Sequence, residues 1–187
     1  MRQMKIVALS IGHSPQDGGS VSADRKWSEF SFWKANIGRV KDELERLGYK
    51  AVVCNRSEVG GITPTYAARA CNATGADLAV EFHFNEADTG IGGTETWCWY
   101  NSEGGKRAAK LIQAAMCDVL KLPDRGLKFV RYKTDKAYMY FKKTNMPALL
   151  LEPSFASSHV TDCDRLEERI EPLCVAIARA IDEFFKG

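Results

Sequence analysis

Four polar side chains, His13, Glu29, His83 and Glu152, occupy positions where this chain otherwise places apolar core. Three of them end or interrupt the hydrophobic runs KIVALSIGH, LAVEFHF and PALLLEP, and the fourth lies on the apolar stripe of the first long predicted helix. Two imidazoles and two carboxylates from separate elements suit a catalytic zinc site, which needs three nitrogen or oxygen ligands, an open position for water and a further carboxylate to move protons. We therefore expect the four side chains to meet at one end of a sheet.

Helical phase sets the position of Glu29. Trp33, Ile37, Val40 and Leu44 recur at steps of four and three, and one further step of four back from Trp33 reaches Glu29. The helix dipole explains an acid in the first turn, but it does not explain why that acid continues the apolar stripe. We interpret Glu29 as a ligand whose carboxylate faces the core.

The two strand-borne residues leave alternatives open. Glu152 follows four apolar residues, and because burying a lone carboxylate is costly it should be metal-linked, protonated, or paired with a Lys or Arg in a structural salt bridge. Burial beside a metal would raise its pKa towards the range of a general base. Strand alternation places Glu81 and Asn85 on the same face as His83, which indicates a wet cleft and makes Glu81 a competing carboxylate.

Alternating strand and helix patterns predict the framework that carries these residues. We expect strands at 4–11, 49–54, 77–85, 93–100, 126–132 and 147–155, and helices at 27–47, 61–75, 102–122 and 162–185. This order predicts a single α/β domain spanning 1–187, with a twisted, mostly parallel or mixed sheet flanked by helices on both faces. His13 would then project beyond the first strand, at the end of the sheet where ligands gather in such folds.

Composition narrows the classes of partner. With 187 residues and a net charge of +2, the chain suits one domain and does not indicate a nucleic-acid partner. The basic stretch 121–143 is interpreted as a solvated face, the alternative being recruitment of an anionic polymer. The six scattered cysteines indicate buried free thiols, and His159 is interpreted as a loop residue outside the metal site. There is no signal-peptide pattern and no apolar run of about 20 residues, so we expect cytoplasmic synthesis without membrane insertion.

The order of motifs resembles the zinc-dependent N-acetylmuramoyl-L-alanine amidases of the amidase 3 family. IGHSPQDGG matches the family's Gly-His strand end and glycine-rich loop, and SEFSFWKAN with LERLGY matches its Glu-opened helix; EFHFNEADTGIGGTET, RGLK and NMPALLLEPSF follow in the family's order. The chain departs where Ser-Ile-Gly-His-Ser replaces Asp-Pro-Gly-His-Gly and where Pro-Ser replaces the Gly that often follows the catalytic Glu. Both departures alter the walls of the expected cleft and bear on substrate preference.

The resemblance implies that His13, Glu29 and His83 bind zinc and that Glu152 is the catalytic carboxylate. The implied reaction is hydrolysis of the peptidoglycan amide between N-acetylmuramic acid and L-alanine by zinc-activated water. Without a wall-binding repeat or an export signal, we expect a monomeric phage endolysin that is released from the cytoplasm at lysis. The alternatives are a zinc peptidase acting on another bond, a catalytically silent peptidoglycan-binding module and a metal-free cytosolic protein. The HExxH zinc-peptidase signature is absent, and His13 and Glu29, sixteen residues apart, do not form an HxxE pair.

Overall fold

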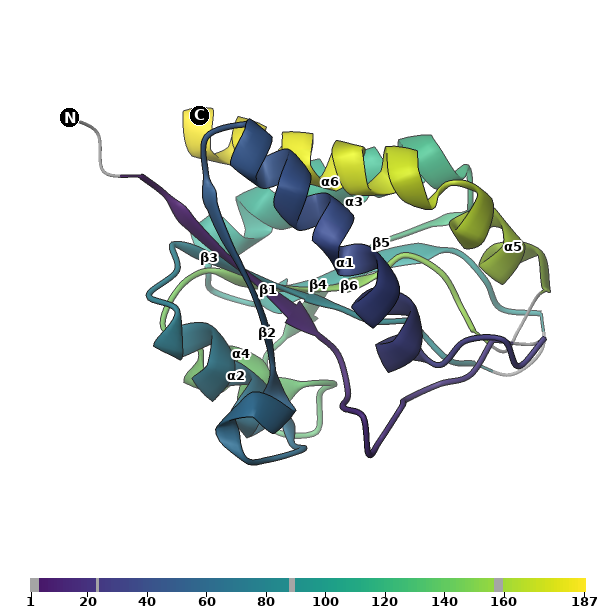
Figure 1. The fold of residues 1–187 in the computed structure, drawn as a ribbon, viewed down its shortest axis with the longest axis horizontal. Helices are drawn as coiled ribbons and strands as arrows, with labels where there is room; N and C mark the ends of the chain where they lie inside the picture. Colours follow the sequence, from purple (N-terminus) through teal and green to yellow (C-terminus); the bar gives the residue numbers. More distant parts are fainter. Residues whose placement is uncertain (1–3, 23, 88–89, 157–159) are drawn as a thin grey trace.

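The computed structural model describes residues 4–22, 24–87, 90–156 and 160–187. Within these residues a sheet of six strands runs through the centre of the molecule, in the order β2-β1-β3-β6-β4-β5 (Figure 1). The strands are β1 (Ile6–Ile11), β2 (Lys50–Asn55), β3 (Leu78–Phe82), β4 (Thr94–Trp99), β5 (Asp124–Val130) and β6 (Ala148–Glu152). The predicted α/β fold with a mixed sheet is confirmed, and the most apolar strand, β6, lies in the interior of the sheet as its composition indicates.

The direction of the strands decides which residues meet. β2, β1, β3 and β6 are parallel, whereas β4 pairs antiparallel with β6 and parallel with β5. The carboxyl ends of β1, β3 and β6 therefore lie beside the amino ends of β4 and β5. We call this the site end of the sheet, and the opposite end, where β4 finishes at Trp99 and β6 begins at Ala148, the far end.

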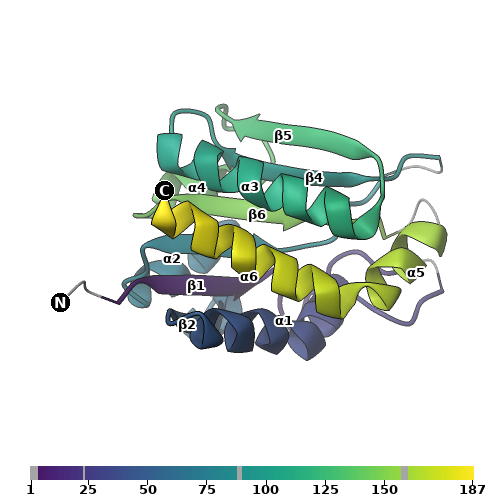
Figure 2. The ribbon, with the colours of Figure 1, turned by 90° about the horizontal axis from the view of Figure 1, so that it is seen from above.

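Helices cover both faces of the sheet. α1 (Glu29–Arg46), α3 (Glu103–Leu120) and α6 (Ile170–Lys186) lie side by side over one face, as Figure 2 shows from above, and α2 (Pro64–Ala73) and α4 (Tyr138–Lys143) cover the other. Both faces of the sheet are consequently apolar, with Leu9 and Leu149 packed towards the first layer and Ala79 and Leu150 towards the second. Within the described residues, no helix has the length and apolar character required to cross a bilayer.

Local signals place the helix ends close to expectation. Ser28 caps α1 by accepting from the Ser31 N–H at 3.2 Å, and the Ser31 side chain completes the reciprocal capping box. Gly48 follows the end of α1 with φ +92°, a conformation that L side chains rarely adopt. Pro64 opens α2, where its missing N–H costs nothing.

The predicted final helix over 162–185 is wrong in one respect, because two helices occupy this segment. α5 (Val160–Glu168) ends before Arg169, which has φ −109° and ψ 11°, and α6 starts at the next residue. Pro172 lies in the first turn of α6. Because proline has no backbone N–H, it could not bond to the Glu168 carbonyl as a continuous helix would require.

Two short elements were also missed by the prediction from sequence periodicity. These are α4, six residues long, and a 3-10 turn, η1 (Arg56–Val59). Neither is long enough to display an amphipathic period. Both nevertheless carry or adjoin residues that reach the site end, since Arg56 belongs to η1 and Lys136 precedes α4.

Candidate metal centre and active site

Three of the four singled-out side chains converge at the site end. His13 follows β1, Glu29 opens α1 and His83 follows β3, and their ligand atoms all lie within 4.8 Å of one another. The Glu29 carboxylate lies between the two rings, with Oε2 3.0 Å from His13 Nε2 and Oε1 3.2 Å from His83 Nδ1. The ring centroids are 5.3 Å apart in an edge-to-face arrangement. The fold thus brings two imidazole nitrogens and a carboxylate to one point.

Backbone geometry keeps these three side chains in place. A Cβ at Gly12 would collide with the His83 ring, and one at Gly19, which has φ +74°, would collide with Glu29 and His13. His13 itself has φ 60°, a left-handed conformation that is uncommon outside glycine. Such strain is found where surrounding structure enforces a functional geometry. The glycine-rich loop is therefore needed for close packing of the cluster.

Backbone N–H groups further restrict the Glu29 carboxylate. Oε2 accepts from the Ser20 N–H at 2.7 Å, and Oε1 accepts from the Phe84 N–H at 2.7 Å. Glu29 is 2 % exposed, so the sequence expectation that it faces the interior is confirmed. Each of its oxygens can still accept a further interaction, because a carboxylate oxygen accepts more than one.

The two imidazoles are held from behind by further carboxylates. His13 Nδ1 lies 3.1 Å from Asp17 Oδ2, and His83 Nε2 lies 3.3 Å from Glu81 Oε2. Glu81 is therefore not a third acid within the cluster, since it meets the ring nitrogen that faces away from Glu29. The His13–Asp17 contact has hydrogen-bond geometry, whereas Glu81 lies at ion-pair distance from His83 Nε2 without that geometry. A carboxylate behind a metal-binding histidine orients the ring and favours the tautomer that presents its other nitrogen to the metal.

Glu81 is itself part of a buried ion pair. The carboxylate lies 3.2 Å from Arg56 Nη2 and accepts from Ser10 Oγ at 3.3 Å, and it is 1 % exposed. His83 is 6 % exposed, so the expectation of a wet cleft around these two residues is wrong. The Arg56 guanidinium, which sequence reasoning did not single out, neutralises Glu81 and thereby permits its burial.

Electrostatics in the cluster favour a cation. Burial opposes ionisation of Glu29, yet its contacts with the two histidines hold its pKa well below the usual range. Burial likewise lowers the pKa of His83, but the adjacent Glu29 and Glu81 carboxylates outweigh it and raise that pKa to about 10. The pocket between the rings consequently attracts positive charge, which a proton or a metal ion can supply.

The donor set fits zinc. Zinc sites use imidazole nitrogens and carboxylate oxygens at about 2.0–2.2 Å, and tetrahedral geometry then places neighbouring ligand atoms roughly 3.3 Å apart. Each ring nitrogen lies near this spacing from one Glu29 oxygen, 3.0 Å from Oε2 for His13 and 3.2 Å from Oε1 for His83. With one ligand atom per residue the three atoms lie within 4.8 Å of one another, a set that small shifts of the side chains would bring to tetrahedral spacing. Three protein ligands also leave a fourth position open, as in catalytic rather than structural zinc sites.

Glu152 ends β6 beside this cluster. The His83 N–H donates to the Leu151 carbonyl at 3.0 Å, which places Glu152 next to His83 across the β3–β6 pair. Glu152 is fully buried, and its Oε1 contacts Lys136 Nζ, so the salt bridge left open by the sequence is present. Its Oε2 has no hydrogen-bond partner within the described residues. Burial raises the pKa of Glu152 to about 7, although the Lys136 ammonium lowers it.

A second set of polar side chains, centred on Glu95 of β4, lies next to Glu152. Glu95 stands directly opposite Glu152 in the β4–β6 register and is 2 % exposed. It accepts from Asn85 Nδ2 at 2.5 Å and Trp97 Nε1 at 3.0 Å, and it pairs with Arg125 at 3.0 Å. The sequence left the roles of these residues undecided. A carboxylate between two threonines at the start of β4, Thr94 and Thr96, gave no distinct signal.

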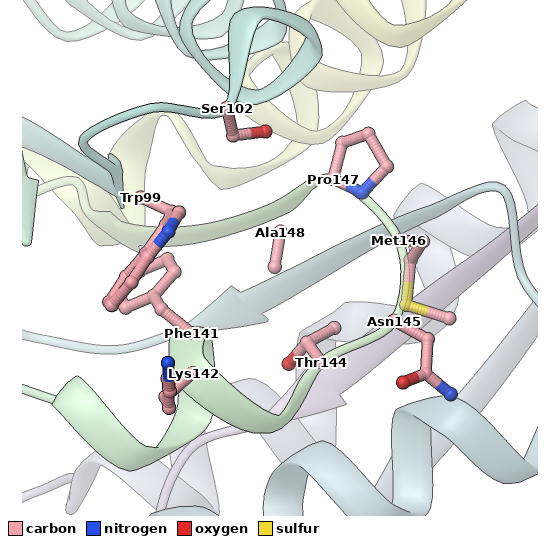
Figure 3. A pocket seen from close by; sticks show the side chains of 9 residues that line it. All are labelled: Trp99, Ser102, Phe141, Lys142, Thr144, Asn145, Met146, Pro147 and Ala148. Atoms are coloured by element: carbon pink, nitrogen blue, oxygen red, sulfur yellow. The ribbon is translucent and has the colours of Figure 1, made fainter.

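A cavity of about 380 Å³ opens at the far end of the sheet, away from the cluster. Figure 3 shows its lining, with Trp99 and Phe141 on one side and Asn145 and Met146 on the other. Lys142 is the one charged side chain among the lining residues, and no carboxylate, imidazole or thiol is present in that set. This cavity therefore lacks the groups that the expected chemistry requires.

The remaining sequence expectations have mixed outcomes. All six cysteines lie in the described part of the chain, where none forms a disulfide, and four of them are buried. His159 lies outside the described residues. The basic stretch 121–143 is largely solvent-exposed, but Arg125 and Lys136 turn to the site end and pair with Glu95 and Glu152.

Comparison with known proteins identifies relatives of this arrangement. The model of the amidase 3 family, N-acetylmuramoyl-L-alanine amidase, matches residues 7–183. An uncharacterized protein, YqiI of Bacillus subtilis (strain 168), is 28 % identical over 97 % of this chain and 85 % of its own length.

Solved structures agree with the fold. The catalytic domain of CwlV, an N-acetylmuramoyl-L-alanine amidase from Bacillus (Paenibacillus) polymyxa var. colistinus, has a TM-score of 0.80 at 25 % identity, covering 98 % of this chain and 99 % of that one. An N-acetylmuramoyl-L-alanine amidase from Clostridium difficile 630 has a TM-score of 0.83 at 20 % identity over 98 % of both chains. Because the family model spans nearly the whole sequence, this chain belongs to the amidase 3 family of N-acetylmuramoyl-L-alanine amidases.

Proposed function

We propose that this amidase-family hydrolase uses zinc to cleave the amide between N-acetylmuramic acid and the L-alanine of the peptidoglycan stem peptide. The observation that carries the proposal is the convergence of His13, Glu29 and His83 within 4.8 Å at the end of the sheet where the buried Glu152 also lies. The family supplies the substrate class, peptidoglycan, and the cluster supplies a reason for metal dependence.

In this proposal His13 Nε2, Glu29 and His83 Nδ1 hold the metal. When bound, zinc supplies a Lewis acid that polarises the scissile carbonyl and makes water acidic enough to attack near neutral pH. Asp17 and Glu81 orient the two imidazoles through their other nitrogens, at 3.1 and 3.3 Å. This outer layer keeps the lone pairs of both rings directed at the same point.

Glu152 is proposed as the general base and acid. Its pKa of about 7 lets it accept a proton from the attacking water and then donate that proton to the departing alanine nitrogen. Oε2, which has no partner in the described part of the chain, is the oxygen available for this transfer. Lys136 holds Oε1, so the carboxylate has a single orientation during both proton movements.

Digestion of purified peptidoglycan tests the proposal. Mass analysis should find fragments with a free lactyl group on muramic acid and a new alanine amino terminus, and a chelator should abolish them. Release of other peptide fragments would instead identify a zinc peptidase. Binding to the wall without any cleavage, together with failure to take up zinc, would identify a silent binding module.

A role as a phage endolysin and a monomeric state stay predictions, as does release of the enzyme from the cytoplasm to the wall. They are tested by expressing the chain inside bacteria. Lysis should follow only when the inner membrane is permeabilised separately, and light scattering should give the mass of one chain.

A further inference from the structure

Arg125 is a guanidinium fixed in place beside the proposed reaction centre. Its Nε lies 3.0 Å from Glu95 Oε2, and its guanidinium carbon lies 4.9 Å from the centroid of the Phe155 ring. Glu95 is in turn fixed by Asn85 and Trp97, so the acceptor that anchors Arg125 cannot move freely. A salt bridge on one edge and an aromatic face below leave the side chain little freedom.

The outer edge of this guanidinium is available to a ligand. Within the described residues, the terminal nitrogens of Arg125 make no hydrogen bond to protein, and its side chain remains 35 % exposed. A guanidinium presents several N–H donors in a planar fork that matches a carboxylate in bidentate geometry. An exposed arginine with a free fork on an immobilised stem is a built anion-binding group.

The location of Arg125 relates it to the substrate. Glu95 and Glu152 are directly opposite each other on β4 and β6, so their side chains share one face about 5 Å apart at Cβ. Arg125 lies one strand further out, on β5. Two strand spacings of about 4.8 Å separate β5 from β6, which corresponds to about two to three consecutive peptide Cα steps of about 3.8 Å. The Arg125 side chain shortens this gap, because it reaches Glu95 on the intervening strand.

A second cation shares this rim with Arg125. This cation is Lys136, whose side chain is partly exposed like that of Arg125. Its Nζ contacts Glu152 and lies 3.3 Å from Asn85 Oδ1. Asn85 thus connects the two, bonded to Glu95 on one side and close to Lys136 on the other. Each cation is paired with one buried carboxylate, Glu95 or Glu152, so it is the donors of the Arg125 fork not used by Glu95 that would meet a ligand carboxylate.

We propose that Arg125 is a specificity residue that binds a free carboxylate on the stem-peptide residue following the alanine. The assignment rests on the proposed amidase function, because it takes the scissile amide to lie beside Glu152. Arg125 would select substrates in which that carboxylate is ionised over those in which it is converted to a carboxamide. It moves no proton and acts only by holding the peptide.

The test uses two muramoyl-peptide substrates that differ only in this group, carboxylate in one and carboxamide in the other. The wild-type enzyme should have a kcat/KM about ten- to a hundredfold higher for the carboxylate, the size expected for charged hydrogen bonds. Arg125→Gln should reduce this ratio to near one by slowing the carboxylate substrate alone. The carboxamide substrate reports any general damage from leaving Glu95 without its cation.

Arg131→Gln is the matched control. It removes the same charge from the same basic stretch, but Arg131 lies past the far end of β5, with its guanidinium over the rings of Tyr100 and Tyr132. Its selectivity ratio should equal that of the wild type. Arg125→Lys, which keeps the charge but not the fork, should retain only part of the preference.

Three results separate the outcomes. Equal kcat/KM for both substrates in the wild type, or an undiminished preference in Arg125→Gln, would overturn the assignment while leaving the amidase function intact. Absence of hydrolysis of either substrate by zinc-supplied wild type would overturn the proposed function. In that event calorimetric binding of the two peptides decides the role of Arg125, and tighter binding of the carboxylate that is lost in Arg125→Gln would sustain it.

Discussion

The two ends of the sheet carry the same kinds of elements but different chemistry. At the far end, a cavity of about 380 Å³ is lined by aromatic, small and amide side chains with one lysine. At the site end, polar groups that are almost completely buried crowd together, among them Glu29, Glu81, Glu95 and Glu152. This cavity and the buried ionisable groups therefore lie at opposite ends of the sheet.

Buried charge is a better indicator of the functional end of the sheet than cavity volume is. A cavity that opens to solvent removes no charge from water, whereas each buried carboxylate must be compensated by a partner. At the site end Arg56, Arg125 and Lys136 compensate Glu81, Glu95 and Glu152, and the His13 and His83 rings flank Glu29. The buried, compensated carboxylates are concentrated where three elements place the candidate metal ligands. This concentration of buried charge distinguishes the site end from the far end.

The largest effect is expected from Glu152→Gln. The amide cannot accept the water proton, so muropeptide hydrolysis should fall by about a hundred- to ten-thousandfold, while zinc content stays at the wild-type level because no proposed ligand is changed. Elemental analysis and product formation by the same preparation would measure both. A fully active Glu152→Gln enzyme would remove Glu152 from the mechanism.

A smaller effect is expected from Glu81→Gln, which weakens the orientation of His83. Zinc affinity should drop by about ten- to a hundredfold, as for other outer carboxylates, and competition with a chromophoric chelator would measure it. Glu43→Gln is the matched control, because Glu43 is also a buried acid paired with an arginine, Arg46, but lies on α1 away from the cluster. Equal zinc affinity in the two variants would contradict a positioning role for Glu81.

Lys136→Met should change pH dependence more than maximal rate. Burial raises the pKa of Glu152 to about 7 and the Lys136 ammonium lowers it, so removing the ammonium raises that pKa further. Because the base must be deprotonated to accept a proton, the acid limb of kcat/KM should move to higher pH, with a greater loss at pH 6 than at pH 8. Lys133→Met, in the same loop, should leave the limb in place, and a shift of Lys136→Met to lower pH would refute the account.

The smallest effect is expected at the far end. Lys142→Ala removes the only charge among the residues that line the cavity there. Hydrolysis and zinc content should nevertheless remain within about twofold of wild type, because surface substitutions away from buried polar networks and metal sites have small effects. Initial rates on purified peptidoglycan would measure this. A loss comparable with that of Glu81→Gln would mean that the far-end cavity takes part in substrate binding.

Much of the fold could be predicted because hydrophobic period and turn residues agree along the chain. The stripe through Trp33, Ile37 and Val40 located α1, and the apolar run 148–151 indicated an interior strand. The division of α5 from α6 was not foreseen, although Pro172 carried the signal, because proline is tolerated in the first turn of a new helix and disfavoured in a helix interior. Short elements such as α4 leave no periodic signal.

The candidate site was predictable for a different reason. Glu29 and Glu152 violate the apolar pattern of their own elements, so each is visible locally. Arg56 and Arg125 violate nothing in their local sequence, and their importance arises only when the fold places them against Glu81 and Glu95. Long-range ion pairs of this kind, separated by 25 and 30 residues, are outside the reach of local patterns.

Zinc titration of the metal-free protein tests the central claim most directly. Chelated wild-type enzyme is supplied with increasing zinc while cleavage of the muramoyl–alanine amide is followed. The rate should rise from near zero and level off at one zinc per chain, whereas His83→Ala should show no such stoichiometric rise. Full activity of the chelated wild type, or a rise that does not level off at one equivalent, would contradict the assignment of His13, Glu29 and His83 as the metal centre.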